Sequence, residues 1–114
     1  MSEYFPDVWV VIKVTPVDEK PIYRVLAGWY GGYLNGDSWK INSGITEFTE
    51  DDKTINFGGY TGSVYKCHRE AERFSGMTGS IFETYSKELE AANIGKMEHI
   101  SYEQFKQEFK PELK

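Results

Sequence analysis

The hydrophobic period of this chain changes at Gly62 and Ser63, and that change constrains the fold more than any other feature of the sequence. Before it, apolar and polar residues alternate in short runs, as in half-buried β-strands. After it, apolar residues recur at helical spacing. A chain of 114 residues suits one domain. We therefore expect a single α+β domain over residues 1–114, with a four-stranded antiparallel meander in the N-terminal half covered on one face by two or three C-terminal helices.

Four segments of the first half are expected to be strands. The first, residues 7–15, is almost continuously β-branched and aromatic, which indicates a central strand covered on both faces. The side of this strand that we expect to face the core carries Val8, Val10, Ile12 and Val14. The other strands are expected at residues 22–29, 38–48 and 53–60, the last with Ile55 and Phe57 inward.

Two residue pairs mark turns or irregularities of the predicted meander. Asn35 and Gly36 favour a tight hairpin turn within residues 31–37, because both residue types adopt positive φ readily. Ser43 and Gly44 predict a bulge inside the third strand.

The second half is expected to begin with a helix capped by Ser63. The apolar stripe of this helix would carry Val64, Cys67, Ala71 and Phe74. A second helix is expected to start at Ser80, which forms a capping-box pattern with Glu83. Gly95 is expected to end that helix as a left-handed cap.

A short strand and a third helix are expected in the remaining segment. Residues 96–100, KMEHI, have the strand pattern. Ser101 and Gln104 form a second capping-box pattern, and Pro111 is expected to end the helix that follows. The inward side chains of this helix would be Tyr102, Phe105 and Phe109.

The charge balance limits the partners of the chain. It carries 13 basic and 18 acidic residues, a net charge of −5. An acidic chain gains little from counterion release, so we expect no binding to duplex nucleic acid and none to an anionic membrane. Complementary potentials favour a protein partner with a basic face.

Localisation is predicted from the single cysteine and from the apolar runs. One cysteine cannot form an internal disulfide, which favours a reducing compartment. The first residues, MSEYFPDVWVV, lack the signal-peptide pattern. No apolar run approaches the roughly 20 residues that span a bilayer. We therefore expect a cytoplasmic protein.

Cys67 and His68 raise the question of catalysis. On a helix, adjacent side chains diverge by about 100°, so the two form no natural chelate. A nucleophile–base pair is disfavoured because Cys67 lies on the predicted apolar stripe, where a thiol is usually inert packing. The sequence has no phosphate-binding loop, no serine-nucleophile elbow and no four-ligand zinc spacing. We therefore expect no catalytic residue, no metal and no cofactor. The residues favour a non-enzymatic role, and a small Cys/His hydrolase stays open as an alternative.

Residues 28–45, GWYGGYLNGDSWKINSGI, form the first candidate binding surface. In one interpretation this is only a hairpin, which Trp29 and Trp39 anchor across two strands. In the other, exposed tyrosines on a glycine-rich loop offer a large contact area at low entropic cost. The candidate residues at this hairpin are Tyr30, Tyr33, Asp37 and Lys40.

A second candidate surface is the sheet face opposite the predicted helices. By alternation this face would carry Trp9, Lys13, Arg24, Lys40 and Asn42. It is either a solvated strand face or a cationic, aromatic platform for a nucleotide, a single strand or an acidic partner. A small-molecule or nucleotide-binding module is therefore an alternative to a protein-binding module.

Two strings, WYGGYLNGDSWKINSGI at residues 29–45 and GGYTGSVYKCH at residues 58–68, resemble a pattern in small proteins of tailed bacteriophages that have no established activity. The resemblance covers roughly residues 8–76. It implies a virus-encoded protein of the host cytoplasm, of the size common among host-takeover and counter-defence factors. Such factors usually bind and block a host protein, and this is the function that the resemblance leads us to expect.

Overall fold

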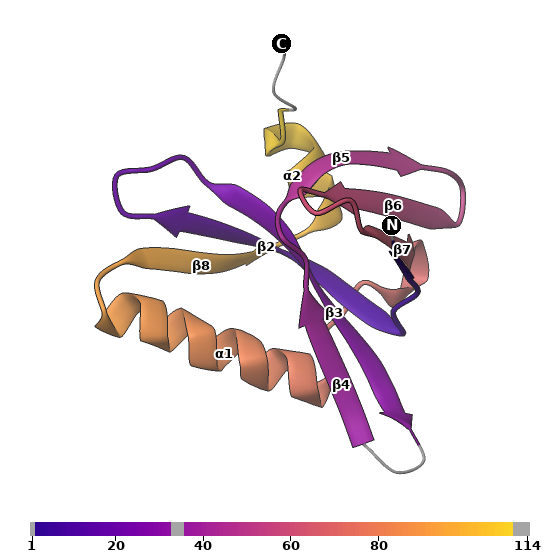
Figure 1. Ribbon diagram of the computed structural model, residues 1–114, viewed down its shortest axis with the longest axis horizontal. Coiled ribbons are helices and arrows are strands. Elements are labelled where there is room, and N and C mark those ends of the chain that lie inside the picture. Colours follow the sequence, from indigo (N-terminus) through magenta and orange to yellow (C-terminus); the bar gives the residue numbers. More distant parts are fainter. Residues whose placement is uncertain (1, 33–35, 111–114) are drawn as a thin grey trace.

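The computed structural model describes residues 2–32 and 36–110, and these form an α+β fold (Figure 1). Its strands are β1 (Glu3–Tyr4), β2 (Val8–Pro16), β3 (Ile22–Gly32), β4 (Gly36–Ile41), β5 (Ile45–Glu50), β6 (Thr54–Gly59), β7 (Val64–His68) and β8 (Gly95–Ile100). Its helices are α1 (Gly76–Ala91) and α2 (Tyr102–Glu108), and a 3₁₀ turn, η1, spans Arg69–Ala71.

The strands form two sheets of four. Sheet A has the order β1-β7-β6-β5, and sheet B has the order β4-β3-β2-β8. All neighbours are antiparallel except β1 and β7, which are parallel. Each sheet contains three consecutive strands, and its fourth strand comes from a distant part of the chain. The predicted single four-stranded meander is therefore wrong.

The predicted third strand, residues 38–48, is two strands in two sheets. The chain leaves sheet B after Ile41 and enters sheet A at Ile45. Gly44 lies at this crossover with φ of 133°, where other residues are strained. The expected bulge is thus the point at which the chain changes sheets. Apolar residues flank the crossover on both sides, so the hydrophobic pattern of the sequence does not reveal it.

The predicted helix after Ser63 is the strand β7 followed by η1. Tyr65 and Cys67 are buried in the core, whereas Lys66 between them is only partly buried and His68 at the end of β7 is exposed. This alternation has the period of a strand. The helical interpretation was wrong because it placed Cys67 on a helical apolar stripe and left Tyr65 out of the apolar pattern.

Helix α1 starts earlier and ends differently from the prediction. Ser75 caps it in a reciprocal box with Thr78, so Ser80 lies inside the helix. Asn93, with φ of 56°, supplies the left-handed residue after the helix, and Gly95 begins β8. The predicted strand at residues 96–100 is confirmed and pairs with β2.

Helix α2 begins where it was predicted. The side chain of Ser101 accepts a hydrogen bond from the Gln104 N–H, as in the expected cap. Tyr102 and Phe105 are buried, and Phe109 packs against the same core. The predicted stop at Pro111 lies outside the described residues.

Strand β2 lies in the middle of sheet B, and its residues 8–12 are buried on both faces, as predicted, whereas residues 13–16 are only partly buried. Trp9 and Val11 face sheet A, in a core completed by Tyr102 and Phe105 of α2. Val10 and Ile12 face α1. Helices α1 and α2 therefore pack on opposite faces of sheet B, and the face expected to meet solvent is covered by sheet A (Figure 1).

Candidate functional site

The second candidate surface contains two residues that the structure buries. Trp9 is 0% exposed, and its Nε1 donates to the His68 carbonyl at 2.6 Å. Asn42 is buried where the chain leaves sheet B, and its Oδ1 accepts from the Val25 N–H at 2.9 Å. Both residues hold the two sheets in place. Their assignment to a solvent-facing surface is wrong.

Two of the three cationic members of that surface, Lys13 and Arg24, lie on opposite faces of sheet B. Arg24 is paired with Ile12 across the strands and so shares the face that α1 covers. Lys13 is on the other face, where its Nζ lies 2.8 Å from the Glu108 carboxylate of α2. The predicted cationic patch therefore does not exist as one face.

The described candidate residues of the hairpin lie on its two paired strands, β3 and β4. Tyr30 is 50% exposed at the end of β3, and its N–H donates to the Asp7 carboxylate at 2.9 Å. Asp37 on β4 accepts from the Gly31 N–H at 2.8 Å. Lys40 is exposed on the same strand. Tyr33 lies outside the described residues.

The two tryptophans that flank the hairpin do not pair. Gly28 lies opposite Trp39 and Ser38 lies opposite Trp29, so the two indoles point to opposite faces of sheet B. Trp29 packs on the core between the sheets, and Trp39 packs on the α1 side. Each anchors one face, and the expected cross-strand pair is wrong.

Three residues that the sequence interpretation missed extend the hairpin surface. Tyr4 packs edge-on against Trp29 with a centroid distance of 6.3 Å, and Lys40 Nζ lies 5.3 Å from the Tyr4 ring centre. Phe5 is 62% exposed, and Lys66 Nζ lies 5.7 Å from its ring centre. These contacts join Tyr4, Phe5, Trp29, Lys40 and Lys66, and Tyr30 adjoins them as the next residue of β3 after Trp29. We call this set of six residues the aromatic–lysine surface.

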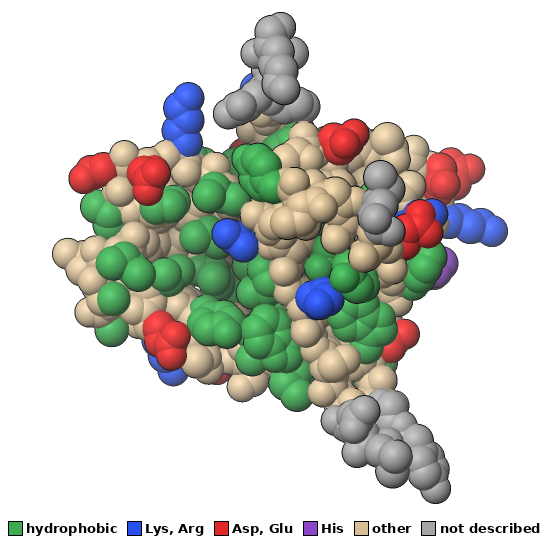
Figure 2. Space-filling view, in the orientation of Figure 1, with side chains coloured by type: hydrophobic (Ala, Val, Ile, Leu, Met, Phe, Trp, Pro, Cys, Tyr) green, Lys and Arg blue, Asp and Glu red, His purple; other side chains and the backbone are tan. Residues whose placement is uncertain are grey.

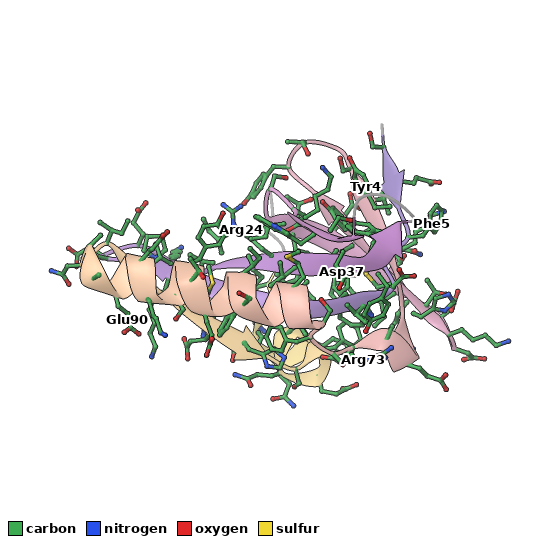
Figure 3. All side chains as sticks on the ribbon, turned by 90° about the horizontal axis from the view of Figure 1, so that it is seen from below. Tyr4, Phe5, Arg24, Asp37, Arg73 and Glu90 are labelled. Carbon is green, nitrogen blue, oxygen red and sulfur yellow. The ribbon has the colours of Figure 1, made fainter. Side chains whose placement is uncertain are left out.

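The aromatic–lysine surface lies at the end of the molecule that carries the β3–β4 hairpin. Figure 3 shows Tyr4, Phe5 and Asp37 on that side, away from Glu90 near the end of α1. No local signal in the sequence places Tyr4 and Phe5 there. Their position follows from the parallel pairing of β1 with β7, about sixty residues away in the chain.

Carboxylates border the aromatic–lysine surface. Glu3 forms an ion pair with Lys66 at 3.1 Å, and Asp7 and Asp37 hold backbone N–H groups of the hairpin. Three acidic side chains thus stand beside two lysines. The local charge has the same sign as the net charge of the chain, −5.

The geometry of Cys67 opposes a nucleophilic role. The thiol is fully buried, its Sγ lies 3.8 Å from the Tyr65 carbonyl, and burial raises its pKa well above the usual range. His68 is exposed at the end of the same strand, so the two side chains point to opposite faces. Within residues 2–32 and 36–110, no three His, Cys, Asp or Glu side chains converge as a metal site.

A polar depression lies beside η1. Its lining includes Lys53, His68, Arg69 and Arg73, which suggests an anion site at first sight. Arg69, however, is ion-paired with Glu50, and its Nε donates to the Asp51 carbonyl at 2.7 Å. Asp52 and Glu70 also line the depression. The positive charges there are largely compensated.

An apolar groove of about 450 Å³ runs between α1 and sheet B. Its apolar lining includes Ile12, Val14, Ile41, Leu89, Ile94 and Met97. Figure 2 shows hydrophobic side chains gathered over the hollow between α1 and the strands. Arg24 on β3 and Glu88 on α1 are the charged residues of the lining.

Neither helix of the described part of the chain is long and apolar enough to cross a membrane. Comparison of the chain with protein-family models, with curated protein sequences and with solved structures gives no match.

Proposed function

We propose that this protein is a binding module that docks on a protein partner through the aromatic–lysine surface and blocks that partner. The observation that carries the proposal is that two rings at the end of the molecule with the β3–β4 hairpin are exposed: Phe5 is 62% exposed and Tyr30 is 50% exposed. Aromatic side chains dominate the binding energy of protein interfaces. Burial of these exposed rings against a partner is favourable, because each fully buried ring removes about 150–250 Å² of surface from water.

The scaffold supports the aromatic–lysine surface from behind. Tyr4 stacks obliquely on the buried Tyr65 at a centroid distance of 4.9 Å, and Trp29 Nε1 donates to the Phe5 carbonyl at 3.0 Å. These contacts fix the backbone that carries Phe5. A surface fixed before binding loses less conformational entropy when it docks, which favours affinity.

The charge of the chain and its resemblance to bacteriophage proteins indicate what kind of partner to expect. The three carboxylates around the surface and the net charge of −5 favour a partner with a basic face. The resemblance to small proteins of tailed bacteriophages supports a host protein as that partner, bound in the host cytoplasm. The role would then be host takeover or counter-defence.

The nucleotide-binding alternative relied on the aromatic loop and on Lys13, Arg24 and Lys40 as one cationic face. It keeps the loop and loses the face, because Lys13 and Arg24 lie on opposite faces of sheet B. The hydrolase alternative relied on Cys67 and His68, whose side chains point to opposite faces of β7.

The test compares surface variants in a quantitative pull-down from a bacterial lysate. Phe5→Ala and Tyr30→Ala should each weaken capture of the retained partner by more than about 1 kcal/mol, with the melting temperature nearly unchanged. Tyr60→Ala is the matched control, because Tyr60 is 69% exposed and lies beside Gly44 at the crossover. It should leave capture unchanged.

Salt dependence tests the charge of the partner separately. Capture by a partner with a basic face should weaken as the salt concentration rises, because exposed charges are screened. Equal loss of capture in Tyr60→Ala and Tyr30→Ala would show that the partner binds elsewhere and would overturn the proposal.

A further inference from the structure

We infer that the groove between α1 and sheet B is a binding site for an amphiphile with an anionic head, of the long-chain carboxylate class, with Arg24 holding the head. This site is separate from the aromatic–lysine surface. Lys40 and Ile41 are neighbours on β4 that point to opposite faces of sheet B, and only Ile41 lines the groove.

The start of α1 packs closely on sheet B, and the groove opens further along the helix, where Glu88 and Leu89 line it. Near its start, Thr78 is buried, and a Cβ added at Gly28 would lie 2.7 Å from Thr78 Cγ2. Near its end, α1 runs beside β8 (Figure 1). There Leu89 and Met97 are only partly buried, and Ile94 just after the helix is 58% exposed. The second half of α1 therefore leaves apolar surface uncovered.

The size and lining of the groove match a small apolar ligand. Its volume of about 450 Å³ falls in the range of roughly 300–1,000 Å³ of small-molecule sites. Aliphatic side chains dominate the lining, whereas the aromatic–lysine surface presents rings. An aliphatic tail fits such a lining, because it replaces water along its whole length.

Arg24 supplies charge complementarity at the border of the groove. Its Nη1 donates to the Asn42 carbonyl at 3.1 Å, which holds the guanidinium in place. Among the described residues, no carboxylate lies within ion-pair distance of Arg24. Guanidinium groups bind carboxylates through short, charge-assisted hydrogen bonds. Glu88 on the α1 side repels an anion, so the head lies at Arg24.

The first experiment uses the wild-type protein and decanoate, below the concentration at which decanoate forms micelles. Backbone NMR shifts on titration should change at groove residues such as Ile12, Leu89 and Met97. Decanol, which lacks the charge, should bind about ten-fold more weakly. Octanoate should also bind about ten-fold more weakly, because two methylenes fewer are buried.

Matched variants test the role of Arg24. Arg24→Gln should weaken decanoate binding about ten-fold, and Arg24→Lys should recover part of the loss. Lys20→Gln removes an exposed cation outside the groove and should change nothing. Glu88→Gln should leave binding unchanged or tighten it slightly.

Several results would overturn the inference. Equal affinity for decanoate and decanol would show that no anion is recognised, and equal affinity for octanoate and decanoate would show that the tail lies outside the groove. Tighter binding of decyltrimethylammonium would assign the head to Glu88. Since these comparisons use the wild type, they decide the matter even if Arg24→Gln does not fold. Shift changes confined to the aromatic–lysine surface would also contradict the site.

Discussion

Glu108 shows how a single side chain joins α2 to sheet B. Its carboxylate accepts hydrogen bonds from Lys13 Nζ at 2.8 Å, Gln104 Nε2 at 2.7 Å and the Tyr23 hydroxyl at 2.9 Å. These three donors lower the pKa of Glu108 to about 2. Burial, and then the hydrogen bond to Glu108, raises the pKa of Tyr23 to about 12. The Lys13 ammonium therefore makes an ion pair within the fold, between β2 and α2.

The lowered pKa makes stability depend on pH. An unfolded glutamate has a pKa of about 4.3, so the Glu108 carboxylate stabilises the fold above that pH, and the stabilisation is lost as the pH falls toward 2. Glu108→Gln should lower the free energy of unfolding by about 1–2 kcal/mol at neutral pH, allowing for solvent screening. Urea unfolding at several pH values measures this difference. A difference that stays constant down to acid pH would contradict the assignment. Glu103→Gln, on the exposed side of α2, is the control and should change little.

Gly44 and Gly36 provide a matched pair at positive φ. Gly44 has φ of 133°, and a Cβ there would lie 2.7 Å from Tyr60 Cε2. Gly36 has φ of 65° with open space around it. We expect Gly44→Ala to lower the free energy of unfolding by about 2–3 kcal/mol and Gly36→Ala by about 1 kcal/mol, as denaturant titration would measure. Equal costs would mean that the crossover does not require glycine.

At the start of α1 the structure differs from the sequence prediction: the capping residue is Ser75, and Ser80 was expected. Ser75 Oγ accepts from the Thr78 N–H at 3.0 Å, and Thr78 Oγ1 accepts from the Ser75 N–H at 2.8 Å. Ser75→Ala should therefore lower the free energy of unfolding by about 1 kcal/mol. Ser80→Ala, which replaces an exposed serine inside the helix, should be neutral or slightly stabilising because alanine has the higher helix propensity. The reverse order in thermal unfolding would restore the predicted start at Ser80.

Elements with a strong local signal could be predicted from the sequence. The β-branched run of β2, the strand β8 and the cap of α2 at Ser101 were all predicted, and the structure confirms them. The change of sheet at Gly44 could not be predicted, because hydrophobic period reports which face is buried and not which sheet buries it. The error at β7 arose because short apolar runs fit both periods.

The candidate site likewise has one part that the sequence could predict and another that it could not. Tyr30, Asp37 and Lys40 lie on two paired strands of one hairpin, and because a hairpin is a local structure the sequence pattern could place them there. Phe5 and Lys66 reach the same surface only through the parallel pairing of β1 and β7. Such pairings between distant segments have no local signature.

At the scale of the whole molecule, β2 joins two cores that would otherwise be separate. Val11 lies in the core between the sheets, and Val10 lies in the core under α1. Losing either core therefore exposes one face of the same strand, and we expect the two cores to unfold in one transition. Val10→Ala and Val11→Ala should each lower the free energy of unfolding by about 2 kcal/mol. In a Trp39→Phe background, which removes the tryptophan on the α1 side, the shift in each variant should be equal for the fluorescence of Trp9 and Trp29 between the sheets and for far-ultraviolet circular dichroism, which includes α1. If Val10→Ala displaced the dichroism transition and left the fluorescence transition in place, the α1 layer would unfold independently and β2 would not couple the two cores.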